Sequence, residues 1–588
     1  MHVSERPREL RWYHAAGMLF GDWGTSRLYV LGLAFVMSAH ASFWYVAAMC
    51  ALVSLVGFSY TIICKHFPDG GGVYSAAKHR SSTLAVIGAL LLIADYIITA
   101  SLSAYEGFRY LLPDGVDSRY AMYAAVASIL GIGALNIFGP KRIGQLALVV
   151  AIISAVFYLI IGVFCIAKSG HATIEAPHES TGEQWSHFVN VILALSGVEA
   201  IANMTGVMAE PVAKNARKAI LVVLLEVVIL NLVMAYAMNA IPDSFLAAQA
   251  HDDKQDHMVK LLSIYYVGHW FASLSSFFFG FLLLSAANTA IGDMVSIQYL
   301  MSRDKEIPPV FTKLNRFGMP WVGLVTATIV PAVVLLLVGN DTVLLADLYA
   351  IGVVGAITIN LMACGTNLKL ELEKWERIVL LAIGVLVGGI ETTIAFEKPK
   401  ALFFALGVLG VGLTTRFAAR RAQKLAVPVE KSKEVTESAV RAAIPLNSAR
   451  LLMPTRGNPA LIQFAVHYAK DRKAALFPLF VREVALTFRE RGAKVGSDTM
   501  TLANDAEARK IFADVQRECD NAGVPMVPLY AVNDSPAEVI LDNAAMFGVD
   551  AVLMGVSQRG AVWKTLKGDV LQDVITYLPK SIPLLIHA

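Results

Sequence analysis

Long apolar runs separated by short polar loops dominate this chain, and they recur from about Leu19 to about Thr415. A helix needs about 20 apolar residues to cross the ~30 Å hydrocarbon core of a bilayer. With 56% hydrophobic and only 16% charged residues, the chain is expected to be an all-α polytopic membrane protein of roughly twelve spans. The approximate limits of the predicted spans are 16–38, 42–64, 83–110, 120–138, 144–167, 187–208, 218–241, 264–299, 320–338, 342–366, 376–396 and 399–416.

Basic residues are distributed unevenly between the two sides of these spans. Because cytoplasmic loops carry the excess of Lys and Arg, both termini are expected in the cytoplasm. The first apolar run is long and contains Asp22, so it is expected to stay in place as a helix and not to be cleaved as a signal peptide. The richer side carries Arg6, Arg8, Arg11, Lys65, Lys78, Arg80, Lys141, Arg142, Lys214, Arg217, Lys218, Arg303, Lys305, Lys313, Arg316, Lys369, Lys374 and Arg377.

Charge and cysteine content exclude several other classes of protein. A net charge of +3 is too small to indicate a nucleic-acid partner. The five cysteines stand alone, without the Cys/His spacing of a metal site, and indicate no disulfide framework. Enzyme motifs such as a His-centred triad or an intact phosphate loop are not seen, so an enzyme is disfavoured.

The composition changes after Arg416. Residues 419–447 are basic and then mixed, and we interpret them as an interfacial segment and linker between a transmembrane domain, 1–418, and a soluble domain, 448–588. In the soluble part, short apolar runs alternate with helical patterns, which predicts a doubly wound α/β domain with a mostly parallel sheet. The predicted strands are RLLMP, AALFPLF, VPMVPLYAV, DAVLMG and IPLLIH.

Two of the predicted spans contain residues that weaken a helix. In the first, the stretch FGDWGTSRLYVLG places Gly24 close to Asp22; in the sixth, ALSGVEAIANMTG places Gly197 between Ser196 and Glu199. If spans one to five and six to ten are two halves, these interruptions correspond, as in transporters built from inverted repeats with a midplane binding site. Freed carbonyls could bind an ion there, whereas glycines alone could simply permit close helix packing.

Acids and hydroxyls strengthen the prediction of a site. Asp95, Thr99 and Ser103 lie at i, i+4 and i+8, so one face of the third span presents a carboxylate and two hydroxyls. Each hydroxyl could instead bond to its own helical backbone. Asp22, Asp95 and Glu199 in one cavity would repel one another, and a bound cation or proton would relieve that repulsion. These three acids are therefore the candidates for coupling cation uptake to protons.

Other polar residues in the spans have more than one interpretation. Arg27 could neutralise a carboxylate or meet an anionic substrate, but a structural ion pair is the favoured interpretation. Tyr29 and Tyr349 could be ion ligands or buried aromatic residues. The pattern does not place four further acids in or near the spans, Glu226, Asp293, Asp347 and Glu391.

At these residues the chain resembles known families. GDWGTSRLY, residues 21–29, resembles the GDxGTSxLY signature of Kup potassium transporters, and residues 14–420 are similar to KimA-type potassium importers of the amino acid-polyamine-organocation superfamily. Other matching segments are FPDGGGVYSAAK, ADYIITASLS, ALSGVEAIAN, RDKEIPPVF and DLYAIGV. The resemblance implies a LeuT-like 5+5 inverted repeat plus two extra helices, in the bacterial inner membrane.

The resemblance also implies an ion site between broken spans one and six and spans three and ten. Its potassium-binding residues would be Asp22, Tyr29, Asp95, Tyr96, Thr99, Ser103, Ser196, Glu199 and Tyr349. Ser196 stands where these importers have threonine, which keeps the hydroxyl. Arg27 replaces a proline or small apolar residue, which puts strict potassium selectivity in question.

The soluble domain resembles the universal stress protein fold. DAVLMGVSQRGAVWKTLKGDVLQDVI, residues 550–575, is similar to its last strand-loop-helix unit, in which Gly555, Gly560 and Gly568 would cradle the phosphates of a nucleotide such as ATP. Gln558 and Asp569 depart from that pattern, and a carboxylate facing phosphate is repulsive. The resemblance suggests a regulatory domain that senses cyclic di-AMP and pairs two protomers; a plain dimerisation module is the alternative.

Together these features predict a proton-coupled potassium importer with a cytoplasmic regulatory domain. The alternative is an amino-acid or polyamine permease of the same architecture, in which Arg27 would receive the substrate carboxylate. A membrane-embedded sensor that does not transport is a further possibility, and uptake activity would distinguish it.

Overall fold

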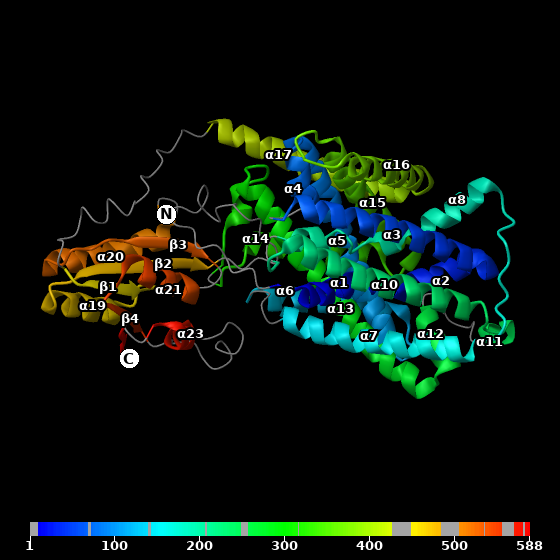
Figure 1. Ribbon diagram of the computed structural model, residues 1–588, viewed down its shortest axis with the longest axis horizontal. Coiled ribbons are helices and arrows are strands. Elements are labelled where there is room, and N and C mark those ends of the chain that lie inside the picture. Colours follow the sequence, from blue (N-terminus) through cyan, green and yellow to red (C-terminus); the bar gives the residue numbers. More distant parts are fainter. Residues whose placement is uncertain are drawn as a thin grey trace.

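The computed structural model describes residues 10–68, 72–113, 115–138, 143–205, 208–248, 257–315, 317–425, 448–483, 502, 505–533, 536–555, 570–579 and 582–587. A helical bundle and a smaller α/β domain make up the molecule (Figure 1). The first half of the bundle contains α1 (Trp12–Trp23), α2 (Arg27–Ser38), η1 (Ala39–Ala41), α3 (Ser42–His66), α4 (Val73–Lys78), α5 (Ser82–Leu111), α6 (Ser118–Asn136) and α7 (Ile143–Lys168).

The second half of the bundle begins with a succession of short helices. It contains α8 (Thr181–Asn190), η2 (Val191–Leu195), α9 (Ala200–Met204), α10 (Val212–Met238), α11 (Asp243–Ala248), α12 (Met258–Tyr266), α13 (His269–Arg303), η5 (Pro309–Thr312), α14 (Trp321–Val338), α15 (Thr342–Thr366), α16 (Lys374–Glu397) and α17 (Pro399–Leu425). Helix α17 thus continues seven residues beyond the predicted end of the transmembrane domain at 418.

Ten helical stretches of the described chain are long and apolar enough to cross a membrane. Nine of them coincide with one predicted span each, and the stretch Trp12–His66 contains the first two predicted spans. The sixth predicted span is not among the ten because it is divided into η2, a turn and α9. The protein is therefore a multi-pass membrane protein, and its sixth span departs from a continuous helix where the glycine and polar residues of ALSGVEA lie.

Helix α5 forms the centre of the bundle. It is the most completely buried of the spanning helices and packs against α13 and α15. Helices α14, α16 and α17 lie at the periphery and expose large apolar side chains, including Leu337, Phe396 and Phe403. Exposed apolar surface of this kind is the surface that lipid covers. The polar face of α5 is thus directed into protein while the peripheral helices provide the lipid boundary.

The soluble domain is a five-stranded parallel sheet with helices on both faces, as predicted. The strands β1 (Arg450–Pro454), β2 (Ala475–Glu483), β3 (Leu529–Asn533), β4 (Ala551–Gly555) and β5 (Leu584–His587) are ordered β3-β2-β1-β4-β5. One core lies under α19 (Pro459–Asp471) and α20 (Ala506–Ala522). A second core lies under α21 (Pro536–Phe547) and α23 (Val570–Tyr577), so each sheet face is covered.

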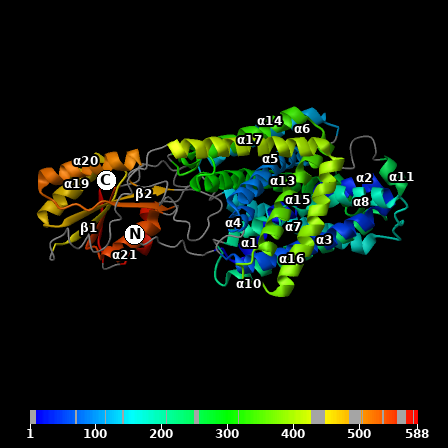
Figure 2. The same cartoon turned by 90° about the horizontal axis from the view of Figure 1, so that it is seen from above.

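The soluble domain adjoins one end of the bundle (Figure 2). The contact involves the segment between η5 and α14, where Gly318 has a φ of +80°. A Cβ built on Gly318 would lie 2.5 Å from the backbone oxygen of Glu483, at the carboxyl end of β2. Only glycine permits this approach. The contact places the carboxyl edge of the sheet against the segment between η5 and α14, which follows α13.

Asp505 is expected to be a major source of stability in the soluble domain. Its carboxylate caps α20 by accepting from the Ala508 N–H at 3.0 Å, and it accepts hydrogen bonds from Arg482 at 2.6 and 2.8 Å and from Tyr530 at 3.0 Å. Burial raises the pKa of Asp505, but these donors outweigh burial and the pKa is lowered. Asp505→Ala should therefore lower the free energy of unfolding by ~2–3 kcal/mol.

Because the folded-state pKa of Asp505 is depressed, its contribution is present above the unfolded value and is lost as the pH falls through the folded value. Urea denaturation of the 448–588 fragment at pH 7 and at acidic pH measures this. The difference between wild type and Asp505→Ala should shrink at the acidic pH; an unchanged difference would contradict the assignment. Asp514→Ala is the control; the Asp514 side chain is 45% exposed and makes only a surface ion pair with Arg517 at 3.5 Å, so its loss should have little effect.

Candidate functional site

The first helix break separates α1 from α2 at residues 24–26. The hydroxyl of Thr25 donates to the backbone oxygen of Asp22 at 2.6 Å, and that of Ser26 donates to the oxygen of Trp23 at 2.9 Å. These hydroxyls compete with the helical backbone, which is why the sequence GTS interrupts a helix otherwise favoured by its apolar residues. The break positions Asp22 at the end of α1 and Tyr29 in the first turn of α2.

The second break lies between η2 and α9. Residues 196–199 form a turn in which Gly197 has a φ of +97°, a conformation that strongly favours glycine. The Gly197 N–H donates to Oε2 of Glu199 at 3.0 Å. Ser196 and Glu199 are only 2% and 1% exposed. The break therefore holds a buried carboxylate and a buried hydroxyl on one turn.

The two breaks are in direct contact. A Cβ built on Gly197 would lie 2.8 Å from the backbone nitrogen of Trp23 and 3.1 Å from Cγ of Asp22. Any larger residue at 197 would have to displace the first break. The absence of a side chain at Gly197 is therefore what brings Asp22 and Glu199 into the same part of the bundle.

Helix α5 contributes the predicted face of Asp95, Thr99 and Ser103, and all three side chains are buried. The Thr99 hydroxyl donates to the backbone oxygen of Asp95 at 2.9 Å and lies 3.4 Å from its Oδ1. Helix α15 approaches closely at the same level, because a Cβ on Gly352 would lie 2.7 Å from the Asp95 backbone nitrogen. This approach brings Tyr349, one turn earlier on α15, to the α5 face.

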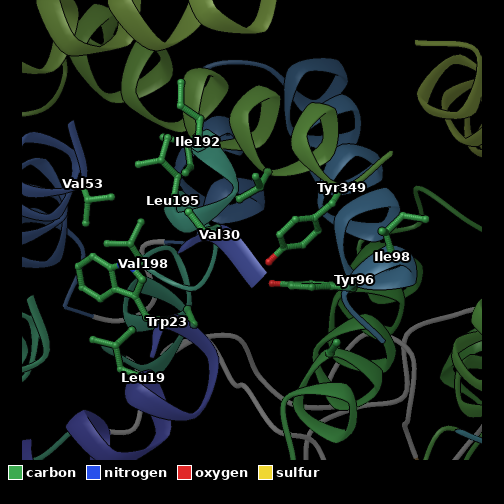
Figure 3. Close-up of a cluster of buried hydrophobic side chains, with 14 of the residues drawn as sticks. Leu19, Trp23, Val30, Val53, Tyr96, Ile98, Ile192, Leu195, Val198 and Tyr349 are labelled. Carbon is green, nitrogen blue, oxygen red and sulfur yellow. The ribbon is translucent and has the colours of Figure 1, made fainter. Parts of the chain in front are cut away.

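Three tyrosines complete the group of predicted residues. The hydroxyl ends of Tyr96 and Tyr349 point toward one another from α5 and α15 (Figure 3). Tyr29 and Ser196 interact with the side chain of Tyr349 from α2 and from the second break. Eight of the nine residues singled out from the sequence thus lie in contact or in electrostatic interaction with one another, and Ser103 lies one turn beyond Thr99 on the same face of α5.

Asp293 on α13 is a residue of this neighbourhood that the sequence pattern did not place. Its side chain is 2% exposed, and it interacts electrostatically with Asp22, Asp95, Glu199 and Tyr96. The sequence signal that could have indicated a role for Asp293 was an acid inside a long apolar helix. Sequence alone could not assign it, because the register of α13 against α5 is set by packing.

Several polar atoms in the neighbourhood have no hydrogen-bond partner among the described residues. They are Asp95 Oδ2, Glu199 Oε1, Asp293 Oδ1 and the Tyr96 hydroxyl. A buried polar atom without a partner is costly unless a ligand satisfies it. Within the described ranges, no three His, Cys, Asp or Glu side chains lie close enough to hold a metal ion together. The unpartnered atoms are carboxylate and hydroxyl oxygens, which are kinds of atom that can bind an alkali-metal cation.

The remaining polar residues in the spans lie outside this group. Arg27 forms an ion pair with Glu226, at 2.6 Å, as the favoured interpretation predicted. Asp347 pairs with Lys398, also at 2.6 Å. Glu391 lies next to Gly355, one turn along α15 from Gly352, with its Oε1 2.9 Å from a Cβ built on that glycine.

The structure describes only some of the predicted nucleotide-binding residues. Gly555 lies at the end of β4, close to Asn458 at the start of α19. Gly560, Gly568, Gln558 and Asp569 lie outside the described residues. Arg456, which follows β1, pairs with Glu483 at 2.6 Å.

Comparison with known proteins agrees with this architecture. Residues 10–411 match the amino acid permease family and residues 452–585 the universal stress protein family. The potassium transporter KimA of Bacillus subtilis is 25% identical over 530 residues, with 83% of this chain and 82% of that protein covered. A probable potassium transport system protein Kup of Caulobacter vibrioides is 30% identical over 156 residues, which are 22% of this chain and 24% of that one.

Among solved structures, a universal stress protein from Archaeoglobus fulgidus aligns at 16% identity, with 24% of this chain and 98% of that chain covered and a TM-score of 0.19. The family match over 10–411 covers more than half of the chain and contains both breaks and the α5 face, and it indicates a transporter, not an enzyme. The chain therefore belongs to the amino acid permease family and carries a C-terminal universal stress protein domain.

Proposed function

We propose that the protein imports potassium across the bacterial inner membrane, with protons as the coupling ion. The observation that carries this proposal is the set of buried, unpartnered oxygens of Asp95, Glu199 and Tyr96 beside two helix breaks, among the described residues. Potassium is bound by several oxygens from carbonyls, hydroxyls and carboxylates that replace its water. The relatives named as potassium transporters, KimA and Kup, support the same substrate.

In this proposal the ion lies between the two breaks, α5 and α15. Asp95 and Glu199 supply the negative charge, while Thr99, Ser103, Ser196 and the tyrosines 29, 96 and 349 supply neutral oxygens. Membrane potential favours inward movement by ~2.3 kcal/mol per charge per 100 mV. The two breaks would move as parts of a 5+5 inverted repeat and expose the site to each side in turn.

Proton coupling follows from the excess of acids. Asp22, Asp95, Glu199 and Asp293 are four carboxylates in one region, and the described basic side chains near them do not pair with them, since Arg27 is held by Glu226. A single potassium ion neutralises one charge, so protons on other acids would balance the rest. Asp22, Asp95 and Glu199 are the coupling residues we propose.

An amino-acid or polyamine permease is the rival, and the family match favours it directly. A substrate carboxylate would need a free cation close to the first break. Arg27 is the nearest candidate, but both of its terminal nitrogens donate to Glu226, at 2.9 and 2.6 Å. The carboxylates at the breaks would repel the carboxylate of an amino acid, so potassium fits the site better than an amino acid does.

For the soluble domain we propose a cytoplasmic regulatory role, with both termini in the cytoplasm. Its carboxyl sheet edge, where doubly wound domains bind ligands, contacts the loop after α13 through Glu483 and Gly318. Binding of a nucleotide such as cyclic di-AMP or ATP at that edge would thus act on the transport helices through this contact. Pairing of two protomers through this domain is part of the same proposal.

Complementation of a potassium-uptake-deficient bacterial strain at low potassium tests the proposed function. The wild-type chain should restore growth, and Asp22→Asn and Glu199→Gln should each abolish the rescue while the proteins remain in the membrane. Labelled amino-acid uptake in the same cells tests the rival. Rescue that survives both substitutions would refute the proposed site, and amino-acid uptake without rescue would favour the permease.

A further inference from the structure

Arg27 is the first residue of α2, immediately after the first break, and its side chain is fully buried. Its NH1 donates to Glu226 Oε1 at 2.9 Å and its NH2 donates to Oε2 at 2.6 Å, a two-bond pair with a single carboxylate on α10. Such paired geometry fixes both partners more strongly than one hydrogen bond does. The pair therefore joins the start of α2 to a helix that contributes no residue to the proposed potassium site.

Aromatic residues also pack against the guanidinium of Arg27. Its carbon lies 4.5 Å from the ring centroid of Tyr158 on α7. That ring stacks on Phe279 of α13, with centroids 4.4 Å apart and planes inclined by 12°. Arg27 is therefore enclosed by α7 and α10 and is itself buried, while the side chain of Glu226 is 24% exposed.

The position of this charge matters for a cation transporter. Tyr29, two residues along α2, interacts with Tyr349 and Asp22 at the proposed site, while Arg27 points to the opposite side of the helix. The amino-terminal end of a helix also carries partial positive charge. Without a counter-charge, the start of α2 would present a buried positive field to an incoming cation.

We propose that Glu226 is a positioning and charge-compensating residue that keeps the proposed site selective for cations: by holding Arg27 in this ion pair, it cancels a buried positive charge beside the first break. The inference rests on the proposed potassium function. It identifies Glu226 as the residue that makes an arginine compatible with that function in this chain. Glu226 itself contacts no ion.

The test compares potassium uptake by full-length protein in liposomes. Glu226→Gln keeps the shape and one hydrogen-bond acceptor but leaves the Arg27 charge uncompensated. By Coulomb's law at an effective dielectric of ~20, a unit charge ~10 Å from an ion changes its affinity roughly tenfold, so KM for potassium should rise by up to about tenfold. The maximal rate per folded protein should stay within about twofold. Glu226→Asp, which keeps the charge, should restore a near-wild-type KM.

The double variant Arg27→Gln/Glu226→Gln removes both charges and should return KM to within about threefold of wild type. A merely structural pair would instead lower the amount of folded protein or the maximal rate and leave KM unchanged. A KM of Glu226→Gln within twofold of wild type, or a double variant no better than the single one, overturns the inference. If wild type takes up no potassium, the proposed function itself fails.

If Glu226→Gln cannot be purified, the KM for potassium of Arg27→Gln alone tests the inference. It leaves Glu226 as an uncompensated negative charge, so KM for potassium should fall. An unchanged or raised KM in that variant would overturn the inference equally.

Discussion

Replacing Asp95 by asparagine is expected to reduce potassium uptake at least a hundredfold. Asp95 is fully buried, and its Oδ2 has no partner among the described residues, so its charge is available to a cation. Removing a carboxylate that directly meets a desolvated ion forfeits several kcal/mol of attraction, of which we expect ~3 kcal/mol to remain after desolvation is counted. Uptake of radioactive rubidium by liposomes over a range of potassium concentrations measures the loss.

Glu391→Gln is the matched control for this substitution. Glu391 also has a buried oxygen with no hydrogen-bond partner among the described residues and also faces α15, but it lies beside Gly355, one turn along α15 from Gly352, and does not interact electrostatically with the described acids of the site. If uptake merely requires every buried acid in the membrane, both variants should lose uptake. If Asp95 binds the ion, only Asp95→Asn should lose it. Equal uptake by the two variants would contradict the role of Asp95.

Sequence was sufficient for the parts of the fold that depend on local pattern. Hydropathy placed the continuous helices because each must bury its backbone in its own hydrogen bonds, and the five strands of the soluble domain followed from alternating apolar runs and helical patterns. The polar stripe on α5 was readable because Asp95, Thr99 and Ser103 repeat at helical spacing. The sequence RFAARRAQKL has high helical propensity, and α17 continues through it to Leu425, inside the predicted interfacial segment 419–447.

The sequence pattern did not predict contacts between distant segments. Nothing local distinguishes Glu226 from Asp293: each is a single acid in an apolar helix, yet one pairs with Arg27 and the other joins the carboxylates around Asp22. Which acid faces which neighbour depends on the rotation of α10 and α13 in the bundle. The sequence of this chain holds no signal for that rotation that is independent of packing.

The second large effect is expected for Gly197→Ala. The substitution meets two penalties, because a side chain at a φ of +97° is strained by ~1–3 kcal/mol and its Cβ would lie 2.8 Å from the Trp23 backbone nitrogen. Backbone atoms cannot rotate away as a flexible side chain can, so the two breaks would have to separate. We expect at least ~3 kcal/mol of destabilisation and loss of most potassium uptake, measured by thermal unfolding in detergent and by uptake in liposomes.

Gly339→Ala separates strain from contact. Gly339, at the end of α14, has a φ of +77°, but a Cβ there would meet nothing within 4 Å. It should therefore show the strain penalty alone and retain uptake. If Gly197→Ala behaves no worse than Gly339→Ala, the contact between the breaks contributes little, and the proximity of Asp22 and Glu199 must be maintained by other packing. If uptake fails only in Gly197→Ala, the direct contact of the two broken helices is what sets the geometry in which a cation is bound.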